Sequence, residues 1–187
     1  MGDSISAAYG MSLQEGWVAL LERRLTDAYP DYQIINASIS GETSAGGAKR
    51  LPALLAQHRP SLVMIELGGN DGLRGYPVSR LQDNLEAMVR AAQAAGARVL
   101  LLAMEIPPNY GSRYTQAFRD SFTAVAAATG ATHVPFMLDG VATDPALMQP
   151  DGIHPTAAAQ PRLRDAVWPY LQQTLQTMQE ESIDNDT

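Results

Sequence analysis

The chain has no cysteine and only three histidines among its 187 residues. Without cysteine it forms no disulfide and offers no thiolate as a nucleophile. The histidines are His58, His133 and His154, and none of them stands at metal-ligand spacing from another. The sequence therefore predicts no metal site.

Basic residues and long apolar runs are also scarce. Lysine and arginine number 13 against 20 acidic residues, which leaves a net charge of −7. This balance argues against a nucleic-acid partner, because no basic stripe is available to neutralise phosphates, and weakly against docking on an anionic membrane. No apolar run approaches the roughly 20 residues of a membrane span, and no signal peptide precedes the first motif. We therefore expect no stable membrane insertion.

The hydrophobic content of 45% suffices for one folded domain. Apolar periodicity predicts helices and strands that alternate along the chain. Expected helices cover residues 13–29, 45–58, 79–95, 114–128 and 156–178, and expected strands cover residues 32–36, 62–67, 99–104 and 132–136. This order predicts an α/β fold with a central parallel sheet between helices. We expect a single domain over residues 1–178 and a frayed acidic tail over residues 179–187.

A possible catalytic relay joins the two ends of the chain. Asp151 and His154 are three positions apart around a glycine, so the carboxylate can hold the imidazole in one tautomer and leave its other nitrogen free as a general base. Ser4 follows a glycine and an aspartate in a turn-forming stretch and is the candidate nucleophile. A lone Asp-x-x-His is also found in ordinary turns with a solvated histidine. The polar loops that follow the strands favour function, because ligands bind at the carboxyl ends of parallel strands.

Three donors can stabilise the negative charge that develops on a carbonyl oxygen during acyl transfer. They are the backbone N–H of Ser4, the backbone N–H of Gly41 and the side-chain amide of Asn70. Gly41 is also readable as a turn glycine, and Asn70 as a helix cap.

Ser4 should follow a strand, as the other polar loops do, but only three residues precede it. Either a strand that belongs ahead of Met1 is absent from this sequence, or the sheet lacks a central member. The second alternative would leave a slot lined by unpaired backbone groups, at a cost of about 1 to 3 kcal/mol for each buried group. We expect the first alternative.

Four sequence blocks together resemble the SGNH hydrolase (GDSL esterase/lipase) superfamily. The blocks are Gly2-Asp3-Ser4-Ile5-Ser6, Gly41, Gly68-Gly69-Asn70-Asp71 and Asp151-Gly152-Ile153-His154-Pro155. Further likeness, in residues 36–44, 66–75 and 108–111, is to the bacterial thioesterase I, lysophospholipase L1 and arylesterase group. In this family the first strand precedes the serine block.

The resemblance implies a three-layer α/β/α flavodoxin-like fold and a catalytic relay of Ser4, His154 and Asp151. It also implies an oxyanion hole from Ser4, Gly41 and Asn70, and hydrolysis of acyl esters and thioesters without metal or cofactor. Members of the family are commonly periplasmic or secreted, which is the localisation we expect. We expect a monomer or a weak dimer.

Apolar loop residues flank the proposed site and are candidates for binding an acyl chain: Leu73, Tyr76, Ile106, Pro108 and Tyr110. Ordinary loop packing is the alternative for all of them.

Two other functions remain open. A carbohydrate acetylesterase would carry more exposed aromatics than a 6% aromatic content allows, and a non-catalytic acyl-binding module would keep the fold without turnover.

Overall fold

A parallel three-stranded sheet forms the centre of the molecule in the computed structural model, which describes residues 1–185. The strands are β1 (Leu62–Ile65), β2 (Arg98–Leu102) and β3 (Thr132–Val134), in the order β1-β2-β3. Val63 lies opposite Val99, and Leu100 lies opposite Thr132. β1 and β2 come from nearly continuous apolar runs, as parallel strands covered on both faces require.

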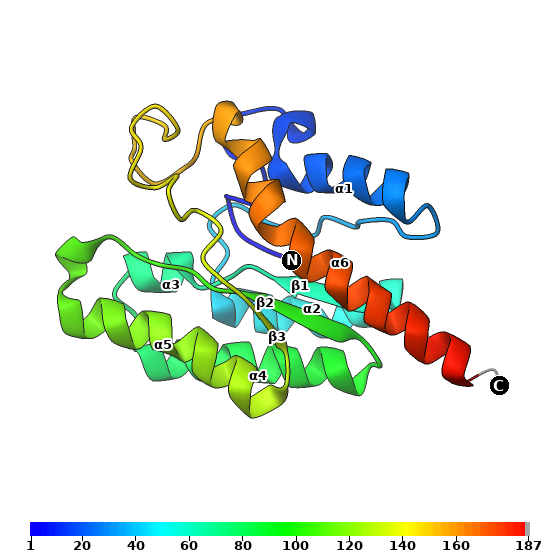
Figure 1. The fold of residues 1–187 in the computed structure, drawn as a ribbon. Helices are drawn as coiled ribbons and strands as arrows, with labels where there is room; N and C mark the ends of the chain where they lie inside the picture. The colour runs from blue at the N-terminus through cyan, green and yellow to red at the C-terminus, as the bar shows by residue number, and fades with distance from the viewer. Residues whose placement is uncertain (186–187) are drawn as a thin grey trace.

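Helices cover both faces of the sheet, so the three-layer α/β/α prediction is confirmed (Figure 1). On one face lie α2 (Ser44–His58), α4 (Val78–Ala94) and α5 (Ser112–Thr129), and on the other lie α1 (Trp17–Ala28) and α6 (Gln160–Asn185). Short helical turns complete the chain: η1 (Leu13–Glu15), α3 (Gly69–Leu73), η2 (Pro108–Tyr110) and η3 (Ala157–Ala159). None of the helices described in residues 1–185 has the length and apolarity to cross a membrane.

Local sequence sets where two of these helices begin and end. The Thr43 hydroxyl accepts a hydrogen bond from the Gly46 N–H and caps α2 at its start. Gly130 adopts a left-handed conformation, with φ of 72°, and ends α5. The expected helix over residues 79–95 is α4, displaced by one residue.

The prediction of a strand over residues 32–36 is wrong. This segment is extended but has no strand assignment, because a cavity lies between it and β1 and no neighbouring backbone pairs with it along its length. A strand needs a partner as well as β-forming residues, and only the second of these conditions can be read from a sequence.

The helix expected to end at residue 178 runs further, because α6 continues to Asn185 and includes the first part of the acidic tail. Arg98, at the start of β2, forms an ion pair with Glu181 on this last part of the helix. Each further residue of an existing helix adds a hydrogen bond without a new nucleation cost, so one contact to the domain favours continuation. Residues 186–187 of the expected tail lie outside the described part.

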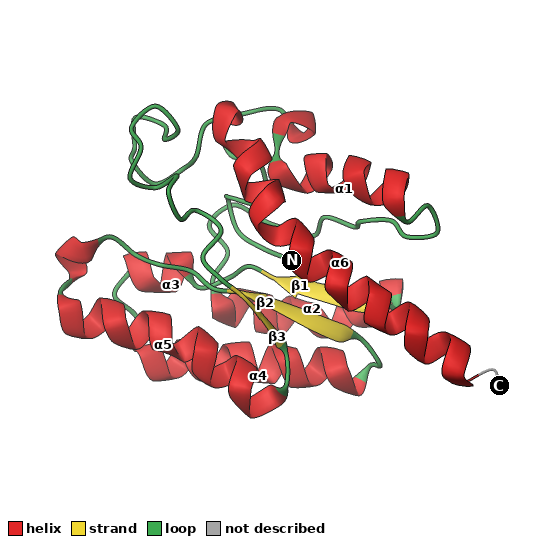
Figure 2. Cartoon of the chain, in the orientation of Figure 1, coloured by secondary structure: helices red, strands yellow, loops and turns green. Residues whose placement is uncertain are grey.

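The loops that follow the strands leave the sheet on the same side (Figure 2). This is a consequence of the parallel arrangement, in which all carboxyl ends lie at one edge. The first residues of the chain reach this edge as well, because Gly2 pairs in parallel with Glu66 just beyond β1. The edge therefore collects the polar loops from distant parts of the sequence.

Candidate active site

A tight turn presents Ser4 at the sheet edge. The Asp3 carbonyl accepts a hydrogen bond from Ala7 N–H, the Ser4 carbonyl accepts one from Tyr9 N–H, and the Asp3 carboxylate accepts one from Ile5 N–H. These bonds wind the chain directly after Ser4, so its side chain stays half-buried but accessible.

A buried glutamate anchors this turn to the sheet. Glu66 Oε2 accepts hydrogen bonds from Ser6 Oγ at 2.6 Å and from Asp3 N–H at 3.3 Å. Burial raises the pKa of Glu66 well above its usual range, which favours a neutral carboxyl group at this depth. Gly2 is required here, since a β-carbon at its position would lie 2.5 Å from Glu66 Oε2.

The hydroxyl, the imidazole and the carboxylate of the predicted relay lie in line. Ser4 Oγ is 2.8 Å from His154 Nε2, and His154 Nδ1 is 2.7 Å from Asp151 Oδ2. The second carboxylate oxygen of Asp151 accepts hydrogen bonds from the backbone N–H groups of His154 and Ile153.

These bonds keep Asp151 ionised. The hydrogen bond from the His154 backbone is the largest cause that lowers the pKa of Asp151 to about 2, and the imidazole and the Ile153 N–H add to it. An ionised Asp151 accepts the proton on Nδ1, so Nε2 is left as an acceptor for the Ser4 hydroxyl proton. The geometry thus favours the tautomer that a general base needs.

Two further residues position His154, one at its ring and one at its backbone, and sequence reasoning missed both. The rings of Tyr9 and His154 lie 4.3 Å apart between centroids. The Gln149 side-chain amide donates to the carbonyls of Tyr9 and Pro155, and its backbone N–H donates to the His154 carbonyl. Gln149 therefore links the serine turn to the histidine loop. No periodicity or motif signals such a contact across 140 positions.

The Gly41 loop is fastened to α3, where Asn70 lies. The Asn70 amide donates to the Glu42 carbonyl at 2.9 Å, and Arg74 donates to the Gly41 carbonyl at 3.2 Å. The Asp71 carboxylate accepts from both the backbone N–H and the hydroxyl of Ser44 at the start of α2. Asn70 itself lies inside α3 rather than at its cap.

The three predicted oxyanion donors differ in their present partners. Within residues 1–185, neither the Ser4 N–H nor the Gly41 N–H donates to another protein group. Gly41 has a φ of 80° and open space around its α-carbon. The Asn70 amide, in contrast, also donates to Asp3 Oδ2 at 3.3 Å. An incoming oxyanion would have to replace that longer bond.

The apolar candidates for acyl binding are divided by their burial. Tyr76 and Tyr110 are exposed by 43% and 36%, and the Tyr110 hydroxyl donates to the Leu73 carbonyl. Pro108 is exposed in η2. Ile106 is only 8% exposed and packs in the core against Gly72 of α3, so it has little surface to offer a substrate. The Ile106 side chain therefore packs in the core, which is the alternative to substrate binding that the sequence left open.

Burial also affects Asp3, which lies between the serine turn and Asn70. Desolvation raises the pKa of Asp3 to about 6, although its hydrogen bond from Ile5 N–H acts in the opposite direction.

Within the described residues no group of three or more potential metal-ligating side chains comes together. The chemistry that these residues offer is nucleophilic attack by a hydroxyl assisted by an imidazole base.

Comparison with known proteins agrees with this chemistry. The model of the GDSL-like Lipase/Acylhydrolase family matches residues 1–161. Esterase TesA of Pseudomonas aeruginosa is 58% identical over 94% of this chain and 87% of that protein. Thioesterase 1/protease 1/lysophospholipase L1 of Escherichia coli K12 is 42% identical over 92% of this chain and 81% of that protein. The crystal structure of the psychrotrophic esterase EstA from Pseudoalteromonas sp., inhibited by monoethylphosphonate, is 47% identical with a TM-score of 0.90, covering 94% of this chain and 96% of that one.

Proposed function

Because the chain belongs to the GDSL-like lipase/acylhydrolase family, we propose that it hydrolyses carboxylic esters and acyl thioesters through an acyl-enzyme on Ser4. The observation that carries this proposal is the 2.8 Å contact between Ser4 Oγ and His154 Nε2. Relatives named as an esterase and as a thioesterase and lysophospholipase support a broad range of acyl substrates.

Acylation begins with attack of Ser4 Oγ on the acyl carbon. As the bond between oxygen and carbon forms, His154 Nε2 takes the hydroxyl proton, and the ionised Asp151 stabilises the resulting imidazolium. The bond from the acyl carbon to the alcohol oxygen or thiol sulfur then breaks, and His154 returns its proton to the leaving group. The acyl group remains as an ester on Ser4.

Deacylation repeats these steps with water. His154 Nε2 removes a proton from water as the water oxygen attacks the acyl carbon, and it then protonates Ser4 Oγ as the acyl-enzyme bond breaks. The products are the carboxylic acid and the free enzyme. No redox partner is involved in either half of the reaction.

In each tetrahedral intermediate, the negative carbonyl oxygen accepts hydrogen bonds from the N–H groups of Ser4 and Gly41 and from the Asn70 amide. The first two have no other protein acceptor within residues 1–185, which supports this role. The fastening of the Gly41 loop to α3 supports it as well, because donors that are held in place before the reaction need no reorganisation during it.

Replacement of Asn70 by alanine is expected to lower kcat about 100- to 1000-fold and to change KM little, because this donor acts mainly on the transition state. Steady-state kinetics with p-nitrophenyl butyrate measures both values. Asn84→Ala is the matched control. The Asn84 amide donates to the Ser44 hydroxyl and so also braces the Gly41 loop, but Asn84 is not a predicted oxyanion donor. An equal loss in both variants would mean that Asn70 only braces the loop.

The segment that contains Leu73 and Tyr76 is proposed to contact the acyl chain, together with Pro108 and Tyr110. The double variant Leu73→Ala with Tyr76→Ala is expected to change the ratio of kcat/KM values for long and short esters by about tenfold. Contacts between an apolar pocket and each methylene group of the acyl chain stabilise the transition state by at most a few kcal/mol, so the loss of some of these contacts gives an effect of this size. Assays with p-nitrophenyl esters from acetate to decanoate give this ratio. An unchanged ratio would remove these residues from the substrate site. Leu13→Ala, on an exposed turn, should leave it unchanged.

A non-catalytic acyl-binding module is the alternative of a different class. It requires no aligned base, yet the hydroxyl, imidazole and carboxylate here lie within hydrogen-bonding distance of one another. Turnover of p-nitrophenyl butyrate by the purified chain separates the two functions, because a binding module releases no p-nitrophenol beyond background. Release of acetate from acetylated oligosaccharides tests the carbohydrate acetylesterase.

A further inference from the structure

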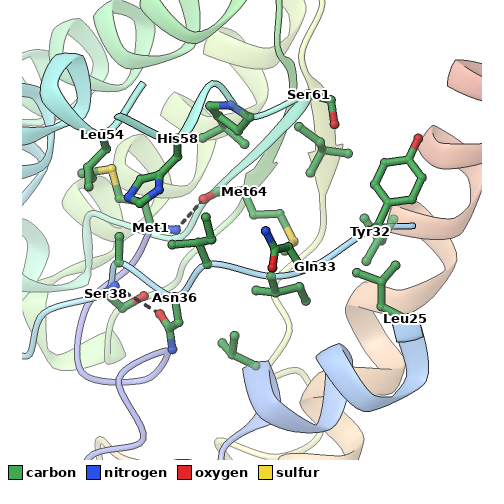
Figure 3. Close-up of a pocket in the computed structure, with 18 of the residues that line it drawn as sticks. Met1, Leu25, Tyr32, Gln33, Asn36, Ser38, Leu54, His58, Ser61 and Met64 are labelled. Carbon is green, nitrogen blue, oxygen red and sulfur yellow. Dashed lines mark hydrogen bonds between the residues drawn. The ribbon is translucent and has the colours of Figure 1, made fainter. Parts of the chain in front are cut away.

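The leaving group of an ester departs beside His154. Its oxygen must come within hydrogen-bonding distance of His154 Nε2 to receive the proton, and Nε2 lies 2.8 Å from Ser4 Oγ. The carbonyl oxygen points away from this place, toward the donors at Gly41 and Asn70. The cavity of about 320 Å³ beside β1 (Figure 3) is lined by neither Ser4 nor His154. The group attached to the departing oxygen therefore lies on the surface around the imidazole.

Tyr9 places an aromatic ring at this surface. The centroids of the Tyr9 and His154 rings are 4.3 Å apart, and the two planes are tilted by 33°. Tyr9 is 50% exposed, so about half of the residue is open to contact. Among the hydrogen bonds of residues 1–185, none involves the Tyr9 hydroxyl. The exposed part of this ring borders the place where the leaving group departs.

The backbone around Tyr9 adopts a conformation that is unusual for side-chain-bearing residues. Ala8 has a φ of 56°, in the left-handed region, and Gly10 has a φ of 77°. Ala8 is buried and packs so closely on Gly16 that a β-carbon there would lie 2.8 Å from the Ala8 methyl group. A non-glycine residue with positive φ is strained and persists only where its surroundings fix it, typically at active sites and ligand clamps. Two left-handed residues thus set the direction of the Tyr9 side chain.

Tyr9 is also bonded through its backbone to both halves of the relay. Its N–H donates to the Ser4 carbonyl at 3.1 Å, and its carbonyl accepts from the Gln149 side-chain amide at 2.8 Å. The backbone N–H of Gln149 in turn donates to the His154 carbonyl. A single exposed tyrosine is ordinary on a protein surface, but this one is fixed beside the reacting atoms. A ring that is already in place loses little freedom when a ligand packs against it.

We propose that Tyr9 forms a leaving-group subsite, on which the aromatic part of an aryl or benzyl ester packs while its departing oxygen lies at His154 Nε2. The subsite rests on the ester hydrolysis proposed above and names the class of alcohol that this site prefers. A flat aromatic group packs on the Tyr9 ring in an offset or edge-to-face arrangement, whereas a small alkyl group covers less of it. The acyl chain is assigned to the segment of Leu73 and Tyr76, so the two preferences are separable.

The same subsite admits aromatic alcohols as acyl acceptors, because acyl transfer to an alcohol is the reverse of acylation. The hydroxyl of a bound benzyl alcohol gives its proton to His154 Nε2 as its oxygen attacks the acyl carbon of the acyl-enzyme. The bond from this carbon to Ser4 Oγ then breaks, and Ser4 Oγ takes the proton from His154. The products are the benzyl ester and the free enzyme. Water and the alcohol compete for one acyl-enzyme, so the ratio of benzyl ester to acid reports binding at the subsite.

The first test compares phenyl butyrate with hexafluoroisopropyl butyrate, whose alcohols have similar acidity. Since kcat/KM includes the acylation step, it reports contacts to the leaving group. Tyr9→Ala is expected to lower kcat/KM for phenyl butyrate about 5- to 10-fold more than for hexafluoroisopropyl butyrate. Tyr9→Phe keeps the ring and should restore the ratio of the two values to within about twofold of that of the unmodified chain. Should Tyr9→Ala not fold, Tyr9→Leu replaces the ring with an aliphatic side chain.

The second test measures acyl transfer from hexafluoroisopropyl butyrate to benzyl alcohol and, separately, to butanol. Tyr9→Ala is expected to lower the ratio of benzyl ester to butyrate about fivefold or more and to change the ratio for butanol less than about twofold. Each ratio compares two products of one acyl-enzyme, so a slow variant still gives it.

The outcomes separate the subsite from the reaction itself. An equal loss of kcat/KM for both esters would mean that Tyr9 only positions the imidazole, and it would overturn the subsite. Product ratios that are unchanged in Tyr9→Ala would overturn it as well, while leaving the hydrolysis intact. No turnover of either ester by the unmodified chain would contradict the hydrolysis, and the subsite with it.

Discussion

Replacement of Ser4 by alanine is expected to lower kcat for p-nitrophenyl butyrate by about 10⁶-fold, to the level of the oxyanion donors and substrate binding alone. The change removes the atom that attacks the substrate, and no second hydroxyl lies in line with His154 among the hydrogen bonds of residues 1–185. Steady-state assays combined with circular dichroism measure activity and folding on the same sample. We expect the fold to survive, because the Ser4 side chain is bonded to His154 alone within that range.

The control for this prediction is Ser79→Ala, which removes an exposed hydroxyl from α4 and should leave kcat within about twofold of the unmodified chain. A folded Ser4→Ala protein that keeps more than a few per cent of the activity would contradict an acyl-enzyme on Ser4. It would point instead to a water molecule activated directly by His154.

Replacement of Asp151 by asparagine is expected to lower kcat by about 10⁴-fold with little change in KM. Asparagine can still accept the backbone bonds from Ile153 and His154, so the loop should keep its shape. Its amide group, however, donates to Nδ1 and favours the tautomer with the proton on Nε2. That tautomer cannot accept the Ser4 hydroxyl proton, and the stabilising charge beside the imidazolium is lost as well.

Asp144→Asn provides the matched control. Asp144 lies in the same long loop and accepts a bond from Ala146 N–H, two residues on, much as Asp151 accepts one from Ile153. Among the hydrogen bonds and ion pairs of residues 1–185, none joins Asp144 to the imidazole, and kcat should stay within a few fold of the unmodified chain. A loss below about tenfold in Asp151→Asn would mean that His154 is oriented mainly by Tyr9 and Gln149.

Much of the fold was predictable because apolar runs and helix-stop residues are local signals. The runs at residues 62–67 and 99–104 predicted β1 and β2, and Gly130 marked the end of α5. The segment of residues 32–36 has the composition of a strand but lacks a paired neighbour. Pairing is a long-range property, so local composition predicted it wrongly. The continuation of α6 past residue 178 likewise depends on Arg98, which is distant in sequence.

The site was predictable where motifs carry the chemistry. The Asp-x-x-His pair and the serine turn identified the three relay residues that the structure brings into line. Residues that act by position alone left no such signal: Gln149 joins the serine turn to the histidine loop, and Glu66 looked like part of an apolar strand although it anchors the turn. Ile106 is an apolar loop residue that was expected to face substrate, and the structure buries it against Gly72 of α3.

The central proposal is that His154 activates Ser4 across 150 positions of sequence, and covalent labelling tests it most directly. The purified chain and its His154→Ala variant are treated with a fluorophosphonate, and the rate and position of the adduct are followed by mass spectrometry of the intact protein and its peptides. We predict one adduct, on the peptide that contains Ser4, and labelling at least about 1000-fold slower in the variant. An adduct on a different residue, or equal labelling rates in two folded proteins, would contradict the proposed relay.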